Sequence, residues 1–174
     1  VSGSSFAWGL DNIEYRDFSS SQNEAPEISQ GVGPLTKTMA EDGMAVWTAS
    51  DLNATDTDTN ANSLTWSLSS AASNGTATVS GTGVSPSTIT YAPNANFYGT
   101  DSFVVQVSDG DQNDTITVNV TVTSVNDVPI VENPLSDLSV TEDAANTTRG
   151  LANVFKDADN TTITKTSTSS NPSL

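Results

Sequence analysis

The sequence contains neither cysteine nor histidine among its 174 residues. Structural zinc sites of the usual kind, thiol nucleophiles, Ser-His-Asp relays and imidazole general bases each need one of these residue types, so all four are excluded. A pair of carboxylates can hydrolyse a glycosidic bond without them, so this absence alone does not exclude catalysis. Most familiar hydrolytic chemistry is nevertheless closed to this chain.

Basic residues are scarce as well, with five Lys and Arg against 21 Asp and Glu and a formal net charge of -16. A surface this acidic repels phosphate backbones, and proteins that bind nucleic acid carry the opposite charge. We therefore expect no nucleic-acid partner. Acidic chains attract divalent cations instead, and Ca²⁺ and Mg²⁺ bind the oxygens that Asp, Glu, Asn and backbone carbonyls supply.

Long apolar runs are also missing, and none approaches the roughly 18 residues of a membrane-spanning helix. Nothing at the N-terminus has the pattern of a cleavable signal, so an export address would lie outside this segment. What the sequence does contain is 25 Ser, 25 Thr and 16 Asn. Short Thr- and Val-rich runs between polar turns predict an all-β protein with almost no helix.

Acidic landmarks recur along the chain at a nearly constant offset, which indicates a tandem repeat of about 100 residues. The segments 23–28 and 126–131 match at an offset of 103, and two acidic pairs match at an offset of 101, Glu41-Asp42 with Glu142-Asp143 and Asp56-x-Asp58 with Asp157-x-Asp159. On this period the chain divides into a tail at 1–22, a complete repeat at 23–127 and an incomplete one at 128–174. The tail reads as the closing strand of an upstream β domain. The incomplete repeat lacks counterparts of the strongest strands, so we expect it to be poorly ordered or sheltered by its neighbour.

Period-two alternation in 103–107 and 116–122 predicts two strands, and the Asp109-Gly110 turn between them predicts an antiparallel hairpin. Further strands are expected at 45–48, 64–68, 77–79 and 88–91. About seven short strands per hundred residues favour a Greek-key β-sandwich of immunoglobulin size. The expected core consists of Trp47, Leu64, Trp66, Leu68, Val79, Ile89, Tyr91, Phe97, Phe103, Val105, Val107, Ile116, Val118 and Val120.

The segment 90–103, Thr-Tyr-Ala-Pro-Asn-Ala-Asn-Phe-Tyr-Gly-Thr-Asp-Ser-Phe, followed by 107–110 and closed by Val-Asn-Asp-Val-Pro at 125–129, resembles the bacterial cadherin-like tandem repeat. The resemblance covers about 24–127 and extends more weakly over 128–174. It implies stacked immunoglobulin-like sandwiches of a large secreted or surface-anchored bacterial protein, with calcium between neighbours.

Carried over by position, the resemblance implies a calcium site at the junction inside this chain. Its ligands would be Glu41, Asn126, Asp127, Asp157 and Asp159, with Asp101 or Asp109 completing the set. The linker is shorter than in animal cadherins and no Asp-Arg-Glu segment is present, which implies one or two ions. The matching upstream places hold Asn23, Glu24, Asp56 and Asp58.

Turn formation is the alternative role of these residues, because Asp and Asn tolerate tight turns and bond their own backbone. Electrostatics favours the ion, since carboxylates about 4 Å apart repel by roughly 1 kcal/mol per pair in water and need a cation or a proton to coexist.

The sequence therefore predicts a calcium-binding extracellular spacer or adhesion repeat, with neighbouring repeats and a cell-surface glycan or protein as partners. It is not expected to be an enzyme, because a narrow sandwich with acidic ends offers little concavity. A carbohydrate-binding module of a polysaccharide-degrading enzyme is the alternative, in which Trp8 or Tyr98 would stack on sugar rings. A polar linker domain without an ion is a third interpretation.

Overall fold

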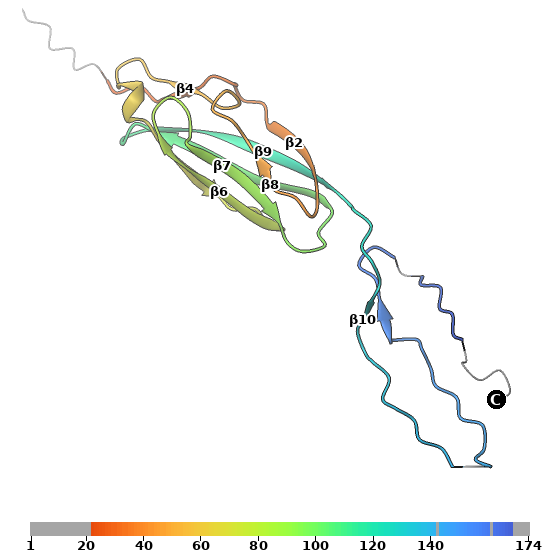
Figure 1. The fold of residues 1–174 in the computed structure, drawn as a ribbon. Helices are drawn as coiled ribbons and strands as arrows, with labels where there is room; N and C mark the ends of the chain where they lie inside the picture. Colours follow the sequence, from red (N-terminus) through yellow and green to blue (C-terminus); the bar gives the residue numbers. More distant parts are fainter. Residues whose placement is uncertain (1–21, 142, 161, 169–174) are drawn as a thin grey trace, which may run out of the picture.

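The computed structural model describes residues 22–141, 143–160 and 162–168, so the predicted tail, apart from its last residue, lies outside the described residues (Figure 1). The strands are β1 (Glu27–Ile28), β2 (Leu35–Ala40), β3 (Ala45–Val46), β4 (Ala54–Thr55), β5 (Thr65–Ser70), β6 (Gly75–Thr82), β7 (Thr88–Pro93), β8 (Gly99–Ser108), β9 (Asn113–Thr123), β10 (Ile130–Val131) and β11 (Phe155–Lys156). The helical content of these residues is one 3₁₀ turn at Ala61–Ser63, which confirms the all-β prediction. No helix among them is long and apolar enough to cross a membrane.

Seven strands form one sheet in the order β2-β9-β8-β5-β6-β7-β3. Strands β5 and β6 pair over three residues only. This short pairing joins two halves of the sheet, β2-β9-β8-β5 and β6-β7-β3, which pack face to face. Phe103 on β8 meets the edge of Trp47 at a centroid distance of 5.9 Å and stacks on Tyr91 of β7 at 6.1 Å. The two halves thus enclose one core, and the predicted β-sandwich is confirmed.

Strands β8 and β9 form the predicted hairpin, with Phe103 opposite Val118 and Val105 opposite Ile116. Their inward side chains alternate with exposed polar ones, because successive residues of a strand point to opposite faces. Asp109 closes the turn by accepting hydrogen bonds from two backbone amides, those of residues 111 and 112. Gly110 has a φ of +111° there, a conformation that suits glycine.

The predicted core is buried, with Leu68 and Phe97 only partly covered and packed against it. Sequence reasoning missed five further core residues of the first sandwich, Ile28, Ala45, Leu52, Ala54 and Val122. Three of them lie in strands of two residues, where no periodicity can be read. Strand β2 was missed as well, since its inward side chains are only partly covered.

Asp101 is a buried carboxylate that holds several parts of the sandwich together. Its Oδ1 accepts from the amides of Ser73 and Ser102, and its Oδ2 accepts from the amide of Asn74 and from the Tyr91 hydroxyl, at 2.8–3.1 Å. Burial acts to raise the pKa of Asp101, but these donors outweigh it and keep that pKa below its ordinary value. Burial also raises the pKa of Tyr91, and the bond to Asp101 adds to the effect.

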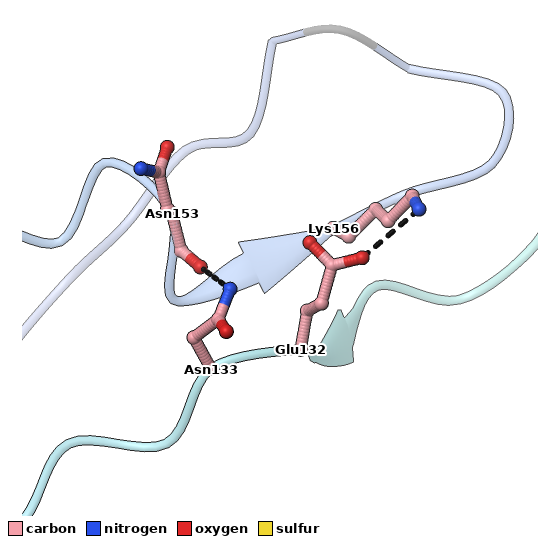
Figure 2. A network of polar contacts seen from close by, with 4 residues as sticks. All are labelled: Glu132, Asn133, Asn153 and Lys156. Carbon is pink, nitrogen blue, oxygen red and sulfur yellow. Dashed lines mark hydrogen bonds and ion pairs between the residues drawn. The ribbon is translucent and has the colours of Figure 1, made fainter.

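Beyond β9 the chain continues as an extended segment into the β10–β11 pair (Figure 1). Asn133 Nδ2 donates to the carbonyl of Asn153 at 2.8 Å, and Lys156 forms an ion pair with Glu132 at 2.9 Å (Figure 2). No further strand is present among the described residues that follow β9, and apolar side chains are exposed there, including Ile130, at 58 %.

We expect Asp101→Ala to lower the free energy of unfolding by about 3 kcal/mol, because it leaves several buried donors unpaired. Tyr91→Phe removes one bond to the same carboxylate and should cost about 1 kcal/mol. Urea titrations of both variants measure the difference. If both variants lose the same free energy of unfolding, the Asp101 carboxylate does not organise the loop at residues 73–74.

Candidate metal centre

The two Asp-x-Asp pairs adopt the same local turn. Asp157 Oδ1 accepts from the amides of residues 159 and 160 at 3.0 and 2.8 Å. Asp56 Oδ1 accepts from the amides of residues 58 and 59 at 3.0 and 2.8 Å. One oxygen of each first aspartate therefore serves turn formation, and the other oxygen is free for a different role.

The second aspartate of each pair accepts a hydrogen bond from a backbone amide of the linker that precedes the strand pair. Asp159 Oδ2 accepts from the amide of Asp127 at 2.6 Å, and Asp58 Oδ2 accepts from the amide of Glu24 at 3.0 Å. Strand β10 pairs with β11 at positions that correspond to the pairing of β1 with β4 at the same two offsets. The two ends of the described chain therefore share one arrangement of linker, short strand pair and acidic loop.

The first sandwich reaches the same linker through Glu41, which directly follows β2. This side chain is only 4 % exposed, and its Oε1 accepts from the amide of Val125 at 2.7 Å. From the other side, Asn160 Nδ2 lies 3.3 Å from Asn126 Oδ1. Linker residues 125–127 are thus bonded to acidic or amide side chains of both flanking segments.

Two carboxylate oxygens at this junction, Glu41 Oε2 and Asp159 Oδ1, are buried and have no hydrogen-bond partner among the described residues. Asp56 Oδ2 is in the same condition at the upstream end. Burial removes the water that would hydrate such an oxygen, and no protein hydrogen bond replaces it, so its desolvation costs free energy. A hard cation would satisfy such oxygens, so these residues fit calcium.

The junction is also electrostatically strained. Burial raises the pKa of the Asp127 carboxyl, and nearby negative charges raise it further. In order of effect these charges belong to Asp159, Asp42 and Asp157. Acidic groups from the first sandwich, the linker and the following segment therefore act on one another, as expected where a cation binds.

The carboxylates are near one another without forming a finished coordination shell. Within the described residues no three or more His, Cys, Asp or Glu side chains are gathered in a metal-binding arrangement. Glu142, which repeats Glu41, lies outside the described residues. A cavity of about 350 Å³ lies beside Asp127 and is lined also by Asn96, Glu132 and Lys156, but not by the other candidate ligands.

Two of the candidate ligands lie elsewhere than expected. Asp101 uses both oxygens for the four core hydrogen bonds described above, so it has none to offer an ion. Asp109 lies just beyond the far end of ten-residue β8, about 30 Å from the end near the linker. It accepts from Asn23 Nδ2 at 2.8 Å, so it belongs to the upstream group with Asp56 and Asp58. Neither residue completes the 126–127 junction, which corrects the assignment made from the sequence.

The fold is an immunoglobulin-like β-sandwich with acidic side chains at both ends. The chain belongs to the bacterial Ig domain family, whose sequence model matches residues 23–123. The resemblance to bacterial cadherin-like repeats is thereby confirmed at the level of the family and fold.

Solved structures with remote similarity include the EC22-24 fragment of mouse cadherin-23, at 20 % identity and a TM-score of 0.47, over 79 % of this chain and 45 % of that one. The endo-fucoidan hydrolase MfFcnA4 from glycoside hydrolase family 107 matches at 20 % identity and a TM-score of 0.43, over 60 % of this chain and 14 % of the enzyme. This chain thus spans less than half of either protein. No curated protein matches.

Replacing Asp127 tests the repulsion directly. Its folded pKa is raised above 3.8, so its ionisation weakens the junction as the pH rises through that folded pKa. At pH 7 in chelator, Asp127→Asn should therefore slow hydrogen exchange of the residue-127 amide, which donates to Asp159. NMR exchange rates corrected for intrinsic exchange measure this, with Asp137→Asn, an exposed carboxylate, as the control. Faster exchange in Asp127→Asn would contradict the repulsion.

Proposed function

We propose that this chain is a non-catalytic, calcium-binding spacer repeat of a larger secreted or surface-anchored bacterial protein. Glu41, Asn126, Asp127, Asp157 and Asp159 would hold the ion between consecutive sandwiches. The observation that carries the proposal is the pair of buried, unpartnered oxygens on Glu41 and Asp159, on either side of linker residue Asp127.

Calcium suits this site because it takes six to eight oxygens at about 2.3–2.6 Å and tolerates irregular geometry. Glu41 would bind it from the first sandwich, Asp127 from the linker and Asp159 from the following segment. One ion would then neutralise the mutual repulsion of these groups and fix the angle between modules. A string of such repeats would become stiff, and it could hold a terminal binding domain away from the cell.

The upstream end supports the same function. Asp56 Oδ2 is buried without a partner, and Asn23, Asp58 and Asp109 surround the entry of the chain. We propose that this group receives the module that precedes residue 23, as the junction group joins 23–127 to a second repeat that begins at 128. A module with a cation site at each end could join a neighbouring module on both sides, and so form part of a chain of repeats.

An extracellular location suits the proposed site. Extracellular calcium modules have dissociation constants of about 10⁻⁴–10⁻³ M, which suits surroundings where calcium is millimolar. At a hundredfold excess over the dissociation constant, each independent site would add about 2.7 kcal/mol of stability.

Isothermal calorimetry with CaCl₂ tests the function. The wild-type chain should bind calcium, and Glu41→Gln and Asp159→Asn should each weaken binding at the junction at least about tenfold, a loss of about 1.4 kcal/mol. Asp137→Asn should bind as the wild type does. Absence of calcium binding would refute the proposal, and saturable retention on insoluble polysaccharide would favour a carbohydrate-binding module instead.

A further inference from the structure

The seven-stranded sheet has two edge strands, β2 and β3, and they face each other across one side of the sandwich. Strand β2 pairs only with β9, in the parallel direction, and β3 pairs only with β7. The Lys37 side chain of β2 reaches the Val46 carbonyl of β3, but no backbone pairing joins the two strands among the described residues. An unpaired edge exposes backbone amides and carbonyls, on which a strand of another chain can pair.

Lys37 lies in the opening between these two edges. Inward and outward positions alternate along β2, and Lys37 occupies the inward position between Leu35 and Met39, which both pack against the core. Its Nζ donates to the Val46 carbonyl at 2.7 Å and lies 5.2 Å from the centre of the Trp47 ring. The aliphatic stem can cover apolar surface there, because the ammonium bonds an oxygen and faces an aromatic ring.

An ion pair does not explain this position. Lys37 is the only basic residue of the 23–127 repeat, yet no carboxylate among the described residues forms an ion pair with it. The pKa of Asp51 is lowered chiefly by the backbone and side-chain hydrogen bonds from Thr48, and the charge of Lys37 is the weakest of the causes. The contacts of the ammonium are thus the Val46 carbonyl and the Trp47 ring, both at the sheet edge.

These contacts oppose the addition of a strand at this edge. An incoming strand would cover the half-buried ammonium and compete for the Val46 carbonyl, which would leave a desolvated charge without its acceptor. An incoming β2 would also bring a second Lys37 to the same place, and like charges repel. Natural sheets use inward-pointing charged residues on edge strands to prevent such pairing.

The strand that this edge must exclude belongs to another copy of the same repeat. Tandem repeats hold identical strands at a high effective concentration, and exchange of elements between repeats is a characteristic error of their assembly. Strands β2 and β3 contain no acidic residue, so the negative charges of the chain lie elsewhere than at this edge. Without Lys37, both strands would be uncharged, and nothing in their side chains would oppose the pairing of two copies.

We propose that the β2–β3 edge is a latent pairing surface for a second copy of this chain, and that Lys37 keeps it unpaired. The hydrogen bond to Val46 occupies a backbone acceptor of the edge, and the charge makes burial under a second strand unfavourable. This role does not depend on the proposed calcium site, which lies in the linkers.

Self-association of Lys37 variants tests the proposal, in chelator so that no cation bridges the acidic ends of two copies. Lys37→Met keeps the aliphatic stem over Trp47, and Lys37→Gln keeps a donor for the Val46 carbonyl, but both lose the charge. Sedimentation equilibrium should show dimers of these variants at concentrations at least about tenfold lower than for the wild type. Lys37→Arg keeps the charge and should behave as the wild type does. Lys165→Met, which changes an exposed lysine in the same way, should also match the wild type.

Cross-linking through one introduced cysteine locates the contact, because the chain has no native cysteine. Thr38→Cys places the thiol on β2, and Ser80→Cys places it on β6, which pairs with β5 on the opposite side of the sandwich. In the Lys37→Gln background, a bismaleimide should link at least about fivefold more dimer through Thr38→Cys than through Ser80→Cys, because paired strands lie close together.

Urea titration of the same variants establishes which of them are folded. The proposal is overturned if a folded Lys37→Gln or Lys37→Met is as monomeric as the wild type. Equal cross-linking through both introduced cysteines would overturn it too, since the copies would then meet without preference for β2. Loss of folding in both charge-removing variants would also count against it, because Lys37 would then serve stability instead of excluding a partner. Calcium calorimetry decides the proposed function separately from all of these outcomes.

Discussion

The junction depends on one kind of interaction, a hydrogen bond from a backbone amide of the linker to a carboxylate of a flanking module. Glu41 accepts from residue 125 and Asp159 accepts from residue 127, so the linker is held from both sides. The same bonds bring negative charges together, and each of these two carboxylates retains one buried oxygen without a donor. The hydrogen bonds that order the linker therefore also leave buried carboxylate oxygens that a cation would satisfy.

Charge is segregated in this molecule. The six longest strands, β2 and β5 to β9, contain only two acidic residues, Asp101 and Asp114, and both use their carboxylates for hydrogen bonds within the sandwich. Most other acidic side chains lie in the connections and linkers. A sandwich whose strands carry few charges, with acidic side chains at its ends, keeps electrostatic repulsion out of the sheet. The repulsion is concentrated in the linkers, where a cation can relieve it.

The two buried carboxylates of the first sandwich show why residue type alone does not reveal a role. Asp101 and Glu41 are both nearly inaccessible and both accept backbone amides. Asp101 has donors for both oxygens, so it is a complete structural group, whereas Glu41 has a donor for only one. The resemblance to cadherin-like repeats made both residues candidate ligands, but only the count of donors around each oxygen separates them.

The sequence by itself determined the all-β class, the hairpin of β8 and β9, most of the core and the period of the acidic landmarks. These features are local or periodic, because alternation fixes which face of a strand is buried and turn residues fix where the chain reverses. The offset also marked Asp127, Asp157 and Asp159 as repeated landmarks, and the resemblance to cadherin-like repeats implied that they share one site. Only the tertiary structure decided that Asp109 lies at the opposite end of β8 from the linker, that Asp101 is fully bonded and that β2 runs parallel to β9. Those outcomes depend on which distant segments meet, and pairing between distant segments follows from the packing of the whole sandwich, which no local pattern records.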